Sequence, residues 1–199
     1  MQKLIELFDC AWDFIESAGG TAKRPEGPWK KGSSGLVESE STLEQFRVSQ
    51  YLEVSLAEAE KWGFEKIAKM LTQAAGSLVW SQNSSYSEAK LGTHFMRNYA
   101  FGLLTGPDAP FAQELPPSGF LLLGKNTEYP AHGHVPREIY LVLTPGAEWS
   151  LDQKNWFSVT PGEVIYHAPN QIHAMRTQSV PMLAFAVWLD DGKRNSISI

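Results

Sequence analysis

The chain has 199 residues, of which 43% are hydrophobic and 12% aromatic, and its formal net charge is -5. This size suits one domain with a decorated end or a small barrel with a helical cap, and leaves ample residues for a core. The acidic balance, with no basic run longer than Lys30-Lys31, argues against a nucleic-acid-binding or anionic-membrane-binding surface. We therefore expect a soluble partner.

The N-terminal residues do not have the pattern of a signal peptide, because they lack a basic start and carry Glu6, Asp9 and Asp13 where an apolar run would be needed. No window approaches the roughly 18 apolar residues that a membrane crossing requires. The single cysteine, Cys10, lies on an apolar helical face and is interpreted as a buried thiol. We expect a cytoplasmic protein, monomeric or homodimeric, without a membrane partner.

The first 81 residues have helical periodicity. Apolar residues recur on one face from 4 to 15, and Gly19-Gly20 predicts the end of this helix. Residues 21–40 are rich in Gly, Pro, Ser and Lys without periodicity, which predicts a long surface loop, either a connector or a mobile lid.

Two further helices are predicted between this loop and residue 76. Ser41-Thr-Leu-Glu44 is a capping-box pattern that would open a helix running to Gly63, with Ser55 marking a restart inside it. Another apolar stripe runs from 64 to Gly76. Since each helix is apolar on one face only, we expect residues 1–81 to form an extension packed on the following domain.

Beyond Ser81 the pattern changes from helical to β, and residues 82–199 are predicted to form one β domain. Short strand candidates bounded by Gly, Pro and Asn lie at 93–104, 119–124, 138–143, 156–159, 163–166 and 181–189. Such spacing predicts a sandwich or a barrel. On the strand at 138–143, even-numbered residues should face the interior of the barrel and odd-numbered residues should pack outward beneath sheet or helices.

The stretch from Tyr129 to Tyr140 contains a candidate metal site. On a strand, side chains two apart share a face, so His132 and His134 point together. Glu138 follows within an apolar run, where an ionised carboxylate is costly unless it is paired or coordinated. A His-x-His alone is often a solvated pair, but with Glu138 and the downstream His173 it predicts a site for Fe, Mn, Zn, Co or Ni.

Two other histidines, His94 and His167, are interpreted as structural residues. His94 stands at no ligand spacing to any other residue, and His167 precedes the turn that delivers His173.

The pattern H-x-H-x-x-x-E, formed by His132, His134 and Glu138 and followed by His173, resembles the two motifs of the cupin superfamily. Tyr129, three residues before the first histidine, and Tyr140, two after the glutamate, resemble more specifically the dimethylsulfoniopropionate (DMSP) lyases of the DddQ type. The resemblance covers about residues 119–189. It implies a mainly β fold with an α-helical N-terminal extension, the β part being a cupin-like antiparallel β-barrel, or double-stranded β-helix.

The resemblance also implies an activity, the β-elimination of DMSP to dimethyl sulfide, acrylate and a proton. One divalent metal would bind the substrate carboxylate, and Tyr140 would take the α-proton. An unperturbed phenol titrates near 10, and a nearby dication lowers that pKa. Tyr129 is expected to flank the pocket as a hydrogen-bond partner, an alternative base or a rim aromatic.

The sulfonium group of such a substrate is a cation without hydrogen-bond donors, which aromatic faces bind well. Trp188 on the last predicted strand is the expected wall for it, by its similar placement to a pocket tryptophan of that family. Other aromatic candidates are Trp149, Trp156 and Tyr166.

Two other function classes share the same ligands: an iron dioxygenase acting on a small chelating acid, and a non-catalytic protein that binds a small acid. Tyr140 separates them from the lyase, because dioxygenation needs no tyrosyl base and a binding module needs no base at all.

Overall fold

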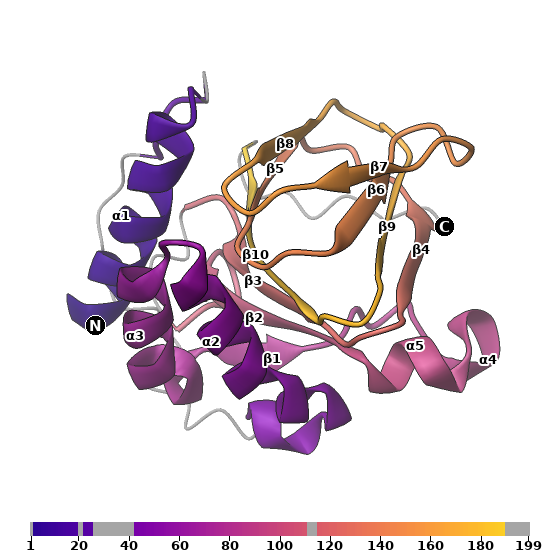
Figure 1. Cartoon of the computed structure of the whole chain (residues 1–199), viewed down its shortest axis with the longest axis horizontal. Helices are drawn as coiled ribbons and strands as arrows, with labels where there is room; N and C mark the ends of the chain where they lie inside the picture. Colours follow the sequence, from indigo (N-terminus) through magenta and orange to yellow (C-terminus); the bar gives the residue numbers. More distant parts are fainter. Residues whose placement is uncertain (1, 20–21, 26–41, 111–114, 190–199) are drawn as a thin grey trace.

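The computed structural model describes residues 2–19, 22–25, 42–110 and 115–189, and Figure 1 shows helices lying against one side of a β structure. The α-helices are α1 (Gln2–Ser17), α2 (Leu52–Lys61), α3 (Glu65–Ala74), α4 (Glu88–Leu91) and α5 (Thr93–Arg97). Short 3-10 helices are η1 (Leu43–Gln45), η2 (Arg47–Tyr51) and η3 (Ala75–Ser77). No helix in these ranges is long and apolar enough to cross a membrane.

The strands form two antiparallel sheets. The larger has the order β1-β2-β3-β10-β5-β8 and the smaller has the order β4-β9-β6-β7. The strands of the larger sheet are Val79–Ser81 (β1), Tyr99–Thr105 (β2), Ser118–Leu123 (β3), Met182–Trp188 (β10), Glu138–Val142 (β5) and Val164–His167 (β8). Those of the smaller sheet are Glu128–His132 (β4), His173–Thr177 (β9), Ala147–Ser150 (β6) and Phe157–Val159 (β7).

This architecture confirms the expected fold class, mainly β and cupin-like with N-terminal helices. The strand pairing refines the picture of a closed barrel, because the described strands hydrogen-bond within two separate sheets. The two sheets are therefore held face to face by their side chains.

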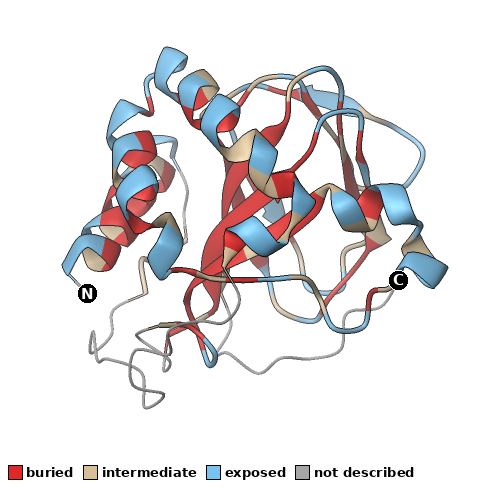
Figure 2. Cartoon of the chain, turned by 90° about the horizontal axis from the view of Figure 1, so that it is seen from below, coloured by how far each residue is buried: buried red, intermediate tan, exposed pale blue. Residues whose placement is uncertain are grey.

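Two hydrophobic clusters lie on opposite faces of the larger sheet. The outer core, between this sheet and the helices, includes Phe8, Ile139 and Leu141. The inner core, between the two sheets, includes Tyr140 and Val142. Successive side chains of a strand point to opposite faces, and the predicted division of this strand into an inward and an outward face is confirmed. Figure 2 shows buried strands with helices that are buried on the side facing them.

The strand predicted at 93–104 begins later than expected. Residues Thr93–Arg97 form helix α5, and β2 starts at Tyr99. Gly92 separates α4 from α5 with a φ of 82°, a left-handed conformation that glycine adopts without strain. Asn98 then donates a side-chain hydrogen bond to the carbonyl of His94, which turns the chain into the strand.

Two features of the first 81 residues also differ from the expectation. Residues Val79–Ser81 form β1, which pairs with β2, so the larger sheet begins inside the range predicted to be a helical extension. The helix expected from Ser41 begins instead as η1 and η2, because α2 starts only at Leu52. Ser41 itself and most of the predicted loop at 21–40 lie outside the described residues.

We propose that residues 1–81 cover the β structure instead of folding alone, and Phe8 provides the test. Its ring lies 5.9 Å from that of Trp12 and 6.1 Å from that of Phe185 on β10. Phe8→Ala should lower the free energy of unfolding by about 3–5 kcal/mol, because it leaves a cavity between α1 and the sheet. Far-ultraviolet circular dichroism of the helices and near-ultraviolet signals of the β-domain aromatics should shift to the same lower midpoint.

The control is Val54→Ala on α2, where the side chain is 44% exposed and the effect should stay within about 0.5 kcal/mol. A Phe8→Ala protein whose helical signal melts early while its near-ultraviolet signal keeps the original midpoint would show that the extension is an independent unit.

Candidate metal centre

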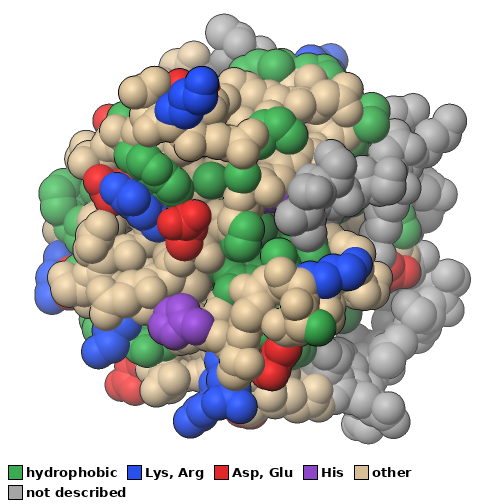
Figure 3. Space-filling model, turned by 90° about the vertical axis from the view of Figure 1, so that its right-hand side faces the viewer, with side chains coloured by type: hydrophobic (Ala, Val, Ile, Leu, Met, Phe, Trp, Pro, Cys, Tyr) green, Lys and Arg blue, Asp and Glu red, His purple; other side chains and the backbone are tan. Residues whose placement is uncertain are grey.

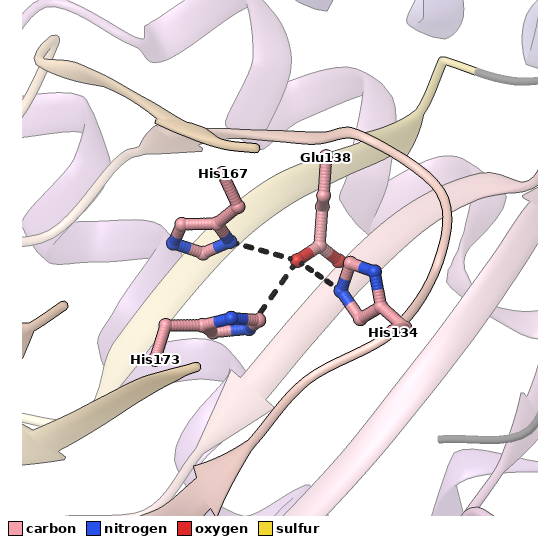
Figure 4. A group of neighbouring side chains, drawn as sticks. All are labelled: His134, Glu138, His167 and His173. Carbon is pink, nitrogen blue, oxygen red and sulfur yellow. Dashed lines mark hydrogen bonds and ion pairs between the residues drawn. The ribbon is translucent and has the colours of Figure 1, made fainter. Parts of the chain in front are cut away.

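Three histidines and a glutamate gather between the two sheets, and Figure 4 shows the histidine rings around one carboxylate oxygen. Glu138 is the first residue of β5, and His167 is the last of β8. His173 begins β9, and His134 lies in the loop between β4 and β5. One potential ligand atom from each of the four lies within 4.8 Å of every other, and all four residues are buried.

The position of these residues follows from strand pairing and loop geometry. Glu138 pairs directly with His167 across β5 and β8. The loop after His167 then crosses to the smaller sheet, so the rings of His167 and His173 stack with centroids 3.7 Å apart. In that loop the backbone N–H of Asn170 donates a hydrogen bond to the carbonyl of His134 at 2.8 Å. This bond connects the loop between β8 and β9 to the loop between β4 and β5.

Glu138 is the electrostatic centre of the group. Its Oε2 lies 2.9 Å from Nε2 of His134 and 3.0 Å from Nδ1 of His167. Burial raises the pKa of the Glu138 carboxyl, but hydrogen bonds from these two histidines outweigh burial and bring that pKa well below its usual range. Glu138 is therefore an ionised carboxylate with 2% of its side chain exposed.

Three histidines share an arrangement of their ring nitrogens that suits metal ligands. Nδ1 of His132, His134 and His173 lies 2.8–3.0 Å from the backbone carbonyl oxygens of Pro130, Pro136 and Gln171. A carbonyl only accepts, so each Nδ1 carries a hydrogen. This is the usual second contact of a ligating histidine, and it leaves Nε2 available to bind a metal.

The donor set fits a divalent transition metal. Nε2 of His173 is buried without a hydrogen-bond partner among the described residues, and it faces Oε2 of Glu138 at 3.5 Å. Nε2 of His173 and Oε2 of Glu138 are both acceptors, so a cation bound between them would stabilise the pair. Both ring nitrogens of His134 face acceptors, so its Nε2 holds a proton that a metal ion would replace.

The pKa values of these histidines differ with their surroundings. Burial lowers the pKa of His132 to about 4 and that of His173 to about 2, so both are neutral near pH 7, as ligands must be. Burial also acts to lower the pKa of His134, but the hydrogen bond and negative charge of Glu138 raise it above its ordinary value.

The predicted residue His132 lies beside the four-residue group. It ends β4, and its ring centroid is 4.2 Å from that of His173 and 6.3 Å from that of His134. The ring of Tyr129 stacks on it at 4.4 Å. Its place as a ligand stays a prediction, whereas His134, Glu138 and His173 are brought together as a ligand set requires.

Tyr140 lies next to the carboxylate, on the same inward face of β5. Burial raises the pKa of its phenol well above 10, and the adjacent charge of Glu138 raises it further. Burial likewise raises the pKa of Tyr129. Both phenols are therefore neutral proton carriers in the metal-free protein.

The aromatic candidates divide into two groups. The ring of Trp188 lies 5.8 Å from that of His134, and its buried Nε1 has no hydrogen-bond partner among the described residues. Trp149 is buried and packs edge-on against Tyr140 at 5.2 Å. In contrast, the guanidinium of Arg176 lies over the ring of Trp156, and Tyr166 is 49% exposed, so neither aromatic residue belongs to the centre.

Sequence reasoning missed two parts of this environment. His167, interpreted as structural, lies within the group because it pairs with Glu138. An aromatic cluster on Tyr129 was also missed, although it includes a hydroxyl contact of 3.2 Å between Tyr86 and Tyr129. The other rings of this cluster are those of Phe95 and Tyr99. The histidine outside the centre is His94, which is exposed and lies 3.0 Å from the carbonyl of Asn126.

Known proteins share both the sequence pattern and the fold. A family model described as dimethylsulfoniopropionate lyase matches residues 30–184. The chain is 30% identical over 119 residues to the dimethylsulfoniopropionate lyase DddQ of Ruegeria pomeroyi, covering 59% of this chain and 58% of that protein. It is 29% identical over 148 residues to the putative dimethylsulfoniopropionate lyase DddL of Cereibacter sphaeroides, covering 74% of this chain and 61% of that protein. These matches thus span less than two thirds of the relatives' own lengths.

Solved structures agree on the fold. A crystal structure of the DMSP lyase DddQ from Ruegeria pomeroyi superposes with a TM-score of 0.74 at 20% identity, covering 100% of this chain and 96% of that one. A chain from the crystal structures of the DMSP lyases RdDddP and RnDddQII gives a TM-score of 0.75 at 21% identity, covering 100% of this chain and 97% of that one.

The ligand set leads to a prediction about metal content. His134→Ala, Glu138→Ala and His173→Ala should each yield folded protein that has lost its metal, since removing one ligand of a small set sharply weakens affinity. His132→Ala tests the remaining predicted ligand in the same way. Elemental analysis of each purified variant, with folding checked by circular dichroism, gives the result.

His94→Ala is the control, because this exposed histidine should leave the metal content unchanged. Full metal occupancy in the Glu138→Ala protein would remove the metal-centre interpretation.

Proposed function

Because the chain belongs to the dimethylsulfoniopropionate lyase family, we propose that it is a carbon–sulfur lyase that cleaves DMSP by β-elimination to dimethyl sulfide and acrylate. The observation that carries this proposal is a buried, ionised Glu138 ringed by histidines, with the hydroxyl of Tyr140 beside it. With a divalent metal bound, this combination would offer a place for a substrate carboxylate next to a phenol that could ionise and accept a proton.

We propose that His134, Glu138, His173 and the neighbouring His132 hold one divalent metal, with Fe, Mn, Zn, Co and Ni all compatible with nitrogen and oxygen ligands. When bound, such an ion supplies positive charge that attracts the substrate carboxylate, acidifies the adjacent C–H bond and favours ionisation of a nearby phenol.

The proposed general base is Tyr140. It lies on the inward face of β5, two residues from Glu138, and Trp149 packs against its ring. A base held by its neighbours needs little reorganisation when the proton moves, which is why positioned groups are effective. The phenolate oxygen of Tyr140 would take the α-proton, and the electrons of that C–H bond would form the double bond between the α- and β-carbons. The C–S bond would break with its electrons on sulfur, releasing neutral dimethyl sulfide and leaving acrylate.

Tyr129 is proposed to bind substrate and to serve as the alternative base. Its hydroxyl contacts that of Tyr86, and its ring packs against His132, so it reaches the same group of residues from β4. Burial raises the pKa of Tyr129, as it does that of Tyr140, so either phenol would need positive charge at the centre to ionise.

Aromatic faces near the centre suit the sulfonium end of the substrate. Trp188 stacks on Phe101 at 6.1 Å and also faces His134, so its ring borders the proposed substrate site. A cation over an aromatic face is attracted by roughly 0.5–2 kcal/mol. Leu91 and Met96 pack against the inner core, and Figure 3 shows hydrophobic side chains gathered on the face of the molecule that includes α4 and α5.

A headspace assay tests the activity. Purified protein reconstituted with Fe, Mn or Zn should release dimethyl sulfide from DMSP in the absence of oxygen, with acrylate formed in equal amount. Product formed only in air would favour a dioxygenase. A protein that binds the substrate under both conditions without turnover would favour a non-catalytic binding role.

A second experiment tests the base. Tyr140→Phe keeps the ring and nearly the same volume, so the fold should survive. Release of dimethyl sulfide should fall at least about 100-fold, because a general base contributes typically about 10²- to 10⁴-fold. Metal content should be measured on the same sample to separate loss of the base from loss of a ligand.

The matched control is Tyr166→Phe, the same change at an exposed tyrosine of β8. If Tyr140→Phe keeps its metal and near-normal turnover, Tyr140 is not the base and Tyr129→Phe becomes the next variant. Activity in both single variants would contradict the proposed proton transfer.

A further inference from the structure

His167 differs from the other three buried histidines in what its ring nitrogens contact. Its Nε2 faces the indole Nε1 of Trp149 at 3.0 Å, and its Nδ1 faces Oε2 of Glu138 at 3.0 Å. Trp149 and His167 are fully buried, and Glu138 is 2% exposed. The three side chains therefore form a continuous hydrogen-bonded chain in the interior.

The direction of each hydrogen bond follows from the chemistry of its end groups. An indole N–H can only donate, so Nε2 of His167 must be the acceptor. A neutral imidazole with a free lone pair on Nε2 carries its hydrogen on Nδ1, and this hydrogen points to the carboxylate oxygen. Trp149 thus selects the tautomer of His167 in which Nδ1 donates to Glu138.

The same contacts make His167 unsuitable as a metal ligand. His132, His134 and His173 place Nδ1 on backbone carbonyls, and Nε2 of His134 and of His173 faces Oε2 of Glu138. In His167 the nitrogen nearest the centre carries the hydrogen, and the other is occupied by Trp149. Coordination through Nδ1 would move that hydrogen to Nε2, directly against the indole N–H.

We propose that His167 and Trp149 form a positioning pair that holds the Glu138 carboxylate in its ligand orientation, and that His167 is not itself a ligand. Hydrogen-bonded partners of metal ligands fix their rotamers and strengthen metal binding. The inference rests on the proposed metal role of Glu138 and assigns to His167 a function that no spacing in the sequence indicates.

Two conservative variants separate the two nitrogens of the ring. The side-chain nitrogen of asparagine is attached to Cγ, as Nδ1 is, so His167→Asn can still donate to Glu138. The amide of glutamine extends to the position of Nε2, so His167→Gln can still accept from Trp149 but no longer reaches Glu138 as Nδ1 does. His167→Gln should therefore weaken metal binding, whereas His167→Asn should leave metal binding nearly unchanged.

Zn(II) affinity, measured by competition with a chromogenic chelator, should fall by about 10- to 100-fold in His167→Gln, the range typical of lost partners of metal ligands. In His167→Asn it should stay within about threefold of the original value, while the melting temperature falls because the N–H of Trp149 is left without an acceptor. His94→Asn and His94→Gln are matched controls that should change neither quantity.

Nitrogen-15 NMR of the histidine rings gives a reading on the unmodified protein, which decides the question even if a variant fails to fold. His167 should show a hydrogen on Nδ1 in the metal-free protein and keep it after Zn(II) is added. The Nε2 signals of His134 and His173 should shift on addition of the metal.

The proposal would be overturned by a hydrogen on Nε2 of His167, by loss of the Nδ1 hydrogen when zinc binds, or by equal affinities for His167→Gln and the original protein. An equal loss in His167→Asn and His167→Gln would also overturn it and would assign His167 as a ligand. None of these readings depends on dimethyl sulfide release, so failure of the lyase activity would be recognised separately in the headspace assay.

Discussion

The charge of Glu138 is the constraint on which the centre depends. Moving an unpaired carboxylate from water into a protein interior costs several kcal/mol even after relaxation, and this one is 2% exposed. The protein compensates it with hydrogen bonds from His134 and His167. His167 belongs to the same sheet as Glu138, but His173 begins β9 of the smaller sheet, so the complete centre forms only when both sheets are assembled. The fold is required for the site, and the buried charge in turn limits which arrangements of the sheets are stable.

The same dependence explains why residues far apart in the sequence meet here. Pairing of β5 with β8 sets His167 opposite Glu138, and the crossing from β8 to β9 brings His173 against His167. The outer face of β5 is meanwhile held by the helices through Ile139 and Leu141. The helices therefore pack on one face of the strand whose other face carries Glu138 and Tyr140.

Much of this could be predicted from the sequence because the decisive signals are local. Alternation along β5 predicts its two faces, and the spacing of His134 and Glu138 predicts that they cooperate. The partner of Glu138 across the sheet could not be predicted, since the register between β5 and β8 depends on packing of the whole sheet. For the same reason His167 was interpreted as structural. The helix at Thr93–Arg97 was missed because the apolar residues around Phe95 suit either a strand or a short helix, and Gly92 decides between them.

The apolar surroundings of the tyrosines constrain any mechanism that uses them. Burial raises the pKa of Tyr140 and of Tyr129, and the charge of Glu138 adds to the effect at Tyr140. A phenol in this setting does not lose its proton near pH 7 through its protein neighbours alone, because the nearest charge is negative. A positive charge at the centre would instead favour the phenolate, and its effect on the phenol is stronger in these apolar surroundings than in water. In the proposed mechanism, the burial that keeps Tyr140 protonated in the metal-free protein would couple its ionisation to binding of the metal, so that Tyr140 would act as a base only where a substrate carboxylate could also bind.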